Sequence, residues 1–161
     1  MAQNTPWVNC DRMHAGLTVG DIKEAVDFYT QKLGFILGFT WGDPPDMAGV
    51  NLGNVSIHLF KGDPDPNPGG GARAYFVIDN VDELYEFHRN NGVNTLSPPA
   101  NQVYELRDYL VKDPYNNILG FGQYMMSTEP KLKIERVEVP VPLEKGLAAL
   151  LKDLARQKGM N

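Results

Sequence analysis

The stretch HAGLTVGDIKEAVDFYTQKLGF (residues 14–35) occurs a second time, in altered form, as RAYFVIDNVDELYEFHRNNGV (residues 73–93). Five pairs of equivalent residues keep one offset of 59 (78 minus 19): Val19 with Ile78, Asp21 with Asn80, Ile22 with Val81, Glu24 with Glu83, and Phe28 with Phe87. A repeat of this period indicates two copies of one strand–helix unit. The same offset pairs His14 with Arg73, so the two copies differ in chemistry at this position.

Each copy carries the signals that begin and end a helix. Asp21 and Asn80 precede the apolar periodic stretches and predict N-caps, and Gly34 and Gly92 follow them as C-terminal stops. Strands are predicted at residues 12–19, 35–41, 47–52 and 55–60 in the first copy. In the second copy they are predicted at 73–78, 102–112 and 117–123, with a further strand around 93–96 that is hard to place. The pattern predicts an α+β fold of two β-α-β-β-β modules.

These predictions divide the chain into one two-module domain and an extension. The domain covers residues 1–125, with module one at 12–60, a Pro- and Gly-rich linker at 61–72 and module two at 73–125. The extension, residues 126–161, has no counterpart in the repeat. It contains a predicted amphipathic helix at 143–158 whose leucines form one stripe. That stripe packs either on the protein's own sheet or on a dimer partner.

Composition narrows the class of protein. The net charge is −5, with 42% hydrophobic and 22% charged residues, which is typical of a globular protein and disfavours nucleic acid as a partner. The single cysteine, Cys10, permits no internal disulfide. No apolar run approaches the roughly 18 residues of a membrane span, and the first 14 residues lack the apolar core of a signal peptide. We therefore expect a cytoplasmic protein that does not enter a membrane.

Two phrases carry a family resemblance. VGDIKEAVDFYTQKLGF (19–35) and VKDPYNNILGFGQ (111–123) resemble the helix and the closing hairpin of the vicinal oxygen chelate superfamily, which includes glyoxalases, bleomycin resistance proteins and extradiol dioxygenases. The resemblance covers residues 13–123 and is nearest to the metal-free bleomycin-resistance branch. Asn116 stands where the family has glycine, and asparagine tolerates the positive φ that such a turn needs. In this superfamily each module curls into a half-barrel with one helix on its outer face.

The resemblance implies four equivalent points where metal-using members hold ligands. In this chain they fall on His14, His58, Arg73 and Gly120. Catalytic metals need three or more protein ligands, and neither arginine nor glycine offers a lone pair from its side chain. We therefore expect no cofactor. A divalent Zn, Ni, Mn or Fe ion held by the two histidines is the disfavoured alternative.

Further residues are candidates for contact with a ligand. Arg73 would attract an anion, aromatic side chains would line the cup, and two charged residues on the long strand would form its rim or a cross-strand pair. The aromatic candidates are Trp41, Phe60 and Tyr75, and the charged pair is Glu105 and Arg107. His88 is expected on the polar, solvated side of the second helix.

Three functions follow as alternatives. The first is a homodimer that binds or sequesters an antibiotic-like or aromatic small molecule without a metal. The second is a lyase, isomerase or dioxygenase of the same superfamily, either metal-dependent or using His14 or His58 as a general base. The third is an interaction module that works through the leucine-striped extension. The sequence leaves open whether the two modules pair within one chain or swap across a dimer.

Overall fold

The computed structural model describes residues 10–125. The first module contains β1 (Ala15–Val19), α1 (Ile22–Asp27), a π-helical continuation η1 (Phe28–Lys32), β2 (Ile36–Gly42), β3 (Pro45–Leu52) and β4 (Val55–Lys61). The second contains β5 (Arg73–Val77), α2 (Val81–Asn90), β6 (Ala100–Asn101), β7 (Leu106–Lys112) and β8 (Ile118–Tyr124). The extension at 126–161, with the helix predicted at 143–158, lies outside the described residues.

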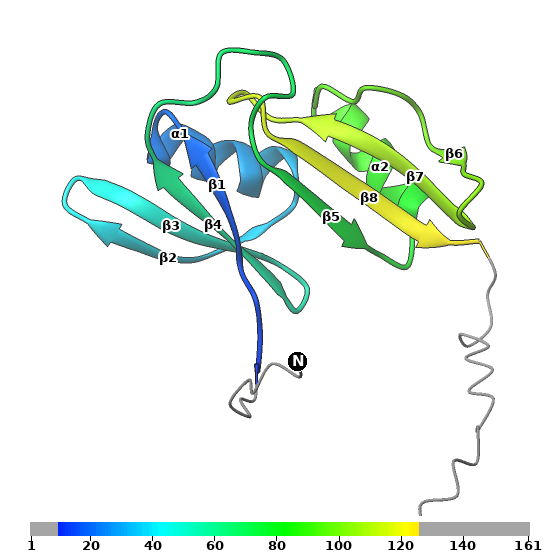
Figure 1. Cartoon of the computed structure of the whole chain (residues 1–161), viewed down its shortest axis with the longest axis horizontal. Coiled ribbons are helices and arrows are strands. Elements are labelled where there is room, and N and C mark those ends of the chain that lie inside the picture. Colours follow the sequence, from blue (N-terminus) through cyan, green and yellow to red (C-terminus); the bar gives the residue numbers. More distant parts are fainter. Residues whose placement is uncertain (1–9, 126–161) are drawn as a thin grey trace, which may run out of the picture. The chain divides into compact units, whose positions relative to one another are not determined.

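Each module forms one open four-stranded sheet (Figure 1). The strand orders are β1-β4-β3-β2 and β5-β8-β7-β6, so corresponding strands occupy corresponding places. The first and last strands of each module run parallel, and the other neighbours run antiparallel. The predicted α+β class and the two β-α-β-β-β modules are confirmed.

The strand register confirms the internal repeat residue by residue. Gly16 lies opposite His58 in the first sheet, and Tyr75 lies opposite Gly120 in the second. Gly16 and Tyr75 are separated by the same 59 residues (75 minus 16) that relate the helices. His58 and Gly120 are therefore structurally equivalent.

The predicted turn and cap residues adopt the expected geometry. The Asp21 carboxylate accepts from the Glu24 backbone N–H at 2.9 Å, which begins α1 as a side-chain cap. Gly34 closes the helical segment with φ of 81°, a conformation that favours glycine. Asn116 has φ of 65°, so the asparagine takes the left-handed position predicted for it.

Two strand predictions in the second module are wrong. The 93–96 segment makes only an isolated bridge from Thr95 to Val111, and the strand in that place is the short β6. Pro98 and Pro99, which separate the two, have no backbone N–H for a ladder. The strand predicted from residue 102 begins at Leu106, because residues 103–105 turn and Glu105 has φ of 61°.

The two modules share one apolar core on the helix side of their sheets. Phe35 of the first module makes an edge contact with Phe76 of the second, with ring centroids 5.6 Å apart. The buried Tyr29 hydroxyl donates to Asp113 at 2.8 Å across the same boundary. No helix among residues 10–125 is long and apolar enough to cross a membrane.

His88 belongs to this core, and its predicted place on the solvated side of α2 is wrong. The side chain is fully buried, with Nε2 3.0 Å from the Leu33 carbonyl oxygen and Nδ1 2.9 Å from the Tyr109 hydroxyl. A carbonyl oxygen only accepts, so Nε2 carries the proton and Nδ1 accepts from Tyr109. Burial lowers the pKa of His88, and the bond to Leu33 opposes that shift in part. The ring is therefore neutral in the folded protein.

The buried neutral His88 predicts a loss of stability in mild acid. Below the ordinary pKa of 6.5, His88 binds a proton in the unfolded chain but stays neutral in the folded protein. The free energy of unfolding therefore falls as the pH drops from 7 towards 5. One such group contributes a slope of at most about 1.4 kcal/mol per pH unit. Urea unfolding across this range measures it. His88→Gln should flatten the slope, and an equal slope in His88→Gln would contradict this account.

Candidate functional site

His14 and His58 lie together on the face of the first sheet that is opposite to α1, which we call its cup face. Their rings stack with centroids 4.5 Å apart and 12° between the planes. His58 occupies β4 between two buried residues, so its ring projects to the other face. His14 precedes β1 by one residue, and its Nδ1 donates to the Ser56 carbonyl oxygen at 3.4 Å.

The pair has its own electrostatics. Burial lowers the pKa of His58, and the neighbouring charge of His14 lowers it further. A proton on His14 therefore disfavours a proton on His58. At neutral pH His58 presents an uncharged aromatic ring.

Two phenylalanine rings lie beside His58 of this pair. Phe39 on β2 makes an edge contact with His58 at 5.5 Å between centroids, and Phe60 lies at 6.2 Å. Two glycines make room for them: any Cβ on Gly49 would collide with the Phe39 ring, and one on Gly16 would lie 3.0 Å from Phe60. The cup face of the first sheet is therefore an aromatic surface built around two imidazoles.

The strand ladders extend this surface to Trp41. Along β2, Phe39 lies opposite Gly49 and Trp41 lies opposite Met47 without a register shift between them, so both rings share one face. Met47 in turn lies opposite Phe60. Trp41 is exposed. Sequence reasoning named Trp41 and Phe60 but missed Phe39, although the two-residue alternation from Trp41 would have indicated it.

The second sheet has a different cup face. The Tyr75 ring covers both Gly120 and Gly122, where any Cβ would collide with it, and its hydroxyl donates to Asp108 at 2.8 Å. The fourth of the predicted points, Gly120, is thus filled by Tyr75. Arg73 is exposed on β5, and the ion pairs of residues 10–125 do not include it.

Arg107 and Glu105 do not form the cross-strand pair that the sequence analysis gave as an alternative to the rim of the cup. The Arg107 guanidinium holds Asp82 of α2 with contacts of 2.8 to 3.1 Å, on the helix side of the sheet. These hydrogen bonds lower the pKa of Asp82. Glu105 is exposed in the turn before β7. The structure therefore brings His14, His58, Phe60 and Trp41 together and leaves Arg107 elsewhere.

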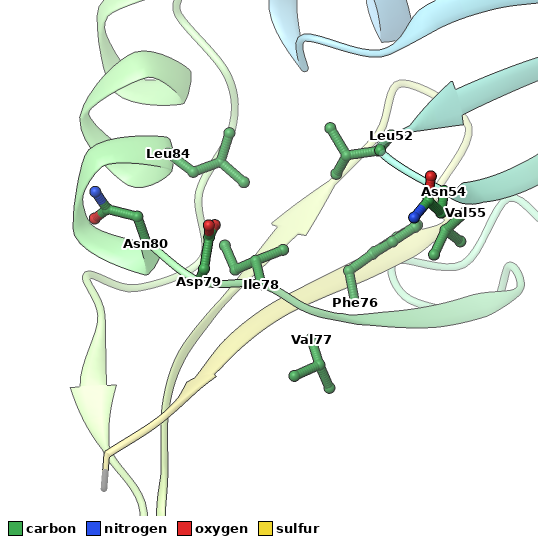
Figure 2. Close-up of a pocket in the computed structure, with 10 residues that line it drawn as sticks. Leu52, Asn54, Val55, Phe76, Val77, Ile78, Asp79, Asn80 and Leu84 are labelled. Atoms are coloured by element: carbon green, nitrogen blue, oxygen red, sulfur yellow. The ribbon is translucent and has the colours of Figure 1, made fainter. Parts of the chain in front are cut away.

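A separate pocket of about 630 Å³ lies between the β3–β4 turn and the junction of β5 with α2 (Figure 2). Its apolar lining residues include Leu52, Ile78 and Leu84. Asp79 contributes a carboxylate to the lining. None of the residues predicted for the site lines it. The pocket is therefore a space distinct from the histidine pair.

The residues at the four points do not fit a catalytic metal. Two imidazoles are present at His14 and His58, Arg73 is a permanent cation, and Gly120 lies under Tyr75. Within residues 10–125 no three His, Cys, Asp or Glu side chains are grouped so that they could hold an ion. The donor set of the described chain falls short of the three ligands that an open metal site requires.

Known proteins resemble this chain in sequence and in fold. The family model of the glyoxalase/bleomycin resistance protein/dioxygenase superfamily matches residues 13–121. Bleomycin resistance proteins of Geobacillus stearothermophilus and Staphylococcus aureus are 30% identical over 130 residues, covering 69% of this chain and 95% of theirs.

Solved structures agree with the fold. A bleomycin-binding protein from bleomycin-producing Streptomyces verticillus, complexed with copper(II)-bleomycin, matches with a TM-score of 0.60 and 24% identity over 70% of this chain and 97% of its own. A fosfomycin resistance protein from Listeria monocytogenes, complexed with Mn(II) and sulfate, matches with a TM-score of 0.58 and 18% identity over 72% and 91%. The repeated modules, the register and these matches agree: the chain belongs to the glyoxalase/bleomycin resistance protein/dioxygenase superfamily.

Proposed function

We propose that the protein binds a small aromatic or antibiotic-like molecule on the cup face of its first sheet, as a homodimer and without a metal ion. The observation that carries the proposal is the stacked His14–His58 pair framed by Phe39 and Phe60. A flat ligand gains stacking and apolar contact on such a surface, beyond the area that it buries. Trp41 would add a further ring at the margin.

The relatives support a ligand of this class. The bleomycin resistance proteins that share 30% identity are aligned over 95% of their own length, so the whole binding fold has a counterpart here. The Streptomyces verticillus protein of the same fold carries its ligand as copper(II)-bleomycin. A metal that arrives within a ligand needs no three-residue site in the protein.

The surroundings of His58 favour binding over base catalysis. A histidine base is commonly oriented by a hydrogen bond from its second nitrogen to a carboxylate or carbonyl. Within residues 10–125, only His14 of this pair has such a bond, to the Ser56 carbonyl, whereas the contacts of His58 are with rings. His58 therefore acts in the proposed site as an aromatic, neutral surface.

A homodimer would complete the site. The two modules of a chain are joined on the helix side, through contacts such as Phe35 with Phe76, and this leaves the cup faces for another partner. β2 is an edge strand whose residues are all exposed, among them Ile36, Leu37 and Trp41. Such an edge offers unpaired backbone groups to another strand, and exposed apolar patches are typical of protein interaction sites. A second copy with its own cup faces is the proposed cover.

Replacing Phe39 should weaken ligand binding. Phe39→Ala removes the ring that frames His58, and we expect at least a tenfold higher Kd for bleomycin, which corresponds to about 1.4 kcal/mol. Isothermal titration measures it. Phe87→Ala is the matched control, because Phe39 and Phe87 are exposed to 41% and 42% and Phe87 lies against Gly34 on the helix side. Equal affinities of the two variants would place the ligand elsewhere.

Charging the edge strand should separate the dimer. Trp41→Lys puts a cation on the proposed interface, and sedimentation should show its dimer dissociating at protein concentrations where the unmodified chain stays paired. Val103→Lys, at a fully exposed position of the turn before β7, should leave the mass unchanged. A monomeric unmodified chain, or a Trp41→Lys variant that pairs normally, would remove β2 from the interface.

A further inference from the structure

The cup face of the second sheet holds a carboxylate in an unusual environment. The Asp108 side chain lies on β7 and only 6% of the residue is exposed. It accepts from the Tyr75 hydroxyl at 2.8 Å, from the Tyr104 hydroxyl at 2.6 Å and from Gln102 Nε2 at 2.9 Å. All three donors are neutral side chains.

This buried charge has no cationic partner in the described part of the chain. The ion pairs there are Arg12 with Asp11, Arg89 with Glu86 and Arg107 with Asp82, and none involves Asp108. Arg107 is adjacent in sequence but lies on the opposite face of β7. Burying a carboxylate is costly unless it is paired or thoroughly hydrogen-bonded.

Asp113 is a second buried carboxylate, and its hydrogen-bond donors differ from those of Asp108. It accepts from two backbone N–H groups, of Tyr115 and Asn117, as well as from the Asn117 amide and the Tyr29 hydroxyl. Asp108 has no backbone donor, and two of its three partners are the hydroxyls of exposed tyrosines. Its environment is therefore open to rearrangement in a way that the Asp113 turn is not.

Three tyrosine rings gather at this carboxylate. Tyr75 lies over Gly120 and Gly122 with nearly half of its surface exposed, and Tyr104 reaches Asp108 from the turn before β7. Tyr124 lies two residues beyond Gly122 on β8, so it shares the face of Tyr75. Burial, the bond to Asp108 and the proximity of the other two phenols all raise the pKa of Tyr75. The three tyrosine side chains therefore form one cluster that is partly exposed to solvent.

The geometry points to a binding site for an organic ammonium group, formed by the rings of Tyr75, Tyr104 and Tyr124 with Asp108 as the counter-charge. The faces of several aromatic rings attract a cation, most strongly a methylated ammonium, and the carboxylate supplies a negative charge that no side chain of residues 10–125 neutralises. This inference rests on the proposed function and deepens it, because it assigns a cationic group to the ligand that the first sheet would hold by stacking.

Choline and its neutral isostere 3,3-dimethyl-1-butanol test the site directly in the full chain. Both probes carry the same bulky head, and only choline carries the charge. Titration followed by NMR of the tyrosine rings should show choline binding with at least tenfold lower Kd, or about 1.4 kcal/mol. Equal binding of the two probes, or no shift of the rings by choline, would overturn the assignment.

Variants locate the binding on the cluster. Asp108→Asn keeps the shape of the side chain and removes its charge, and choline binding should weaken by at least tenfold, whereas Asp82→Asn on the other side of the sheet should change nothing. Tyr124→Leu should weaken choline and Tyr124→Phe should retain it, and neither change disturbs the core because Tyr124 is exposed. Choline affinity unchanged in both Asp108→Asn and Tyr124→Leu would overturn the site.

The two proposals fail independently. Phe39→Ala should leave choline binding intact, because Phe39 belongs to the first sheet and the tyrosine cluster to the second. If choline binds more tightly than 3,3-dimethyl-1-butanol and bleomycin does not bind at all, the ammonium site is supported. The same result would contradict the ligand proposed for the first sheet. Binding of bleomycin that depends on Phe39, together with equal binding of choline and its neutral isostere, would retain the proposed function and remove the ammonium site.

Discussion

The arrangement of both modules depends on the hydrogen bonds that the buried Asp113 carboxylate accepts. It receives the Tyr29 hydroxyl from the first module, and it organises the turn that brings Asn117 to within 3.0 Å of the Thr18 carbonyl oxygen. Burial and the charge of Asp113 raise the pKa of Tyr29, so the phenol stays protonated and donates. These contacts join the two modules on the helix sides of their sheets, and the proposed sites lie on the two opposite faces.

The broken symmetry of the repeat then determines what each face offers. Gly16 and Tyr75 are equivalent, and so are His58 and Gly120. In the first sheet the glycine makes room beside an imidazole, and in the second the tyrosine fills the space above a glycine. Duplication therefore supplied one scaffold, and exchange at two positions produced an aromatic imidazole surface on one sheet and a tyrosine–carboxylate cluster on the other.

Much of this fold is predictable from the sequence because local rules and the repeat agree. The caps at Asp21 and Asn80 and the left-handed turn at Asn116 depend on residue type and spacing alone. The burial of His88 is not predictable in this way, because its partners Leu33 and Tyr109 are distant in sequence and a polar residue on a helix is expected in solvent. The cluster around Asp108 was not predictable from the sequence either. Gln102 and Tyr104 contact Asp108 because residues 103–105 form a turn, whereas the sequence pattern predicts a continuous strand there.

The central claim is that the first cup face binds its ligand through rings rather than through a protein-bound metal. Its most direct test is isothermal titration of chelator-treated, tag-free protein, first with metal-free bleomycin and then, in a separate experiment without bleomycin, with Zn, Ni, Mn or Fe. The account predicts measurable binding of bleomycin to the chelated protein and no stoichiometric uptake of a metal ion by the protein alone. Stoichiometric uptake of one ion by the protein alone, together with loss of bleomycin binding after chelation, would contradict it.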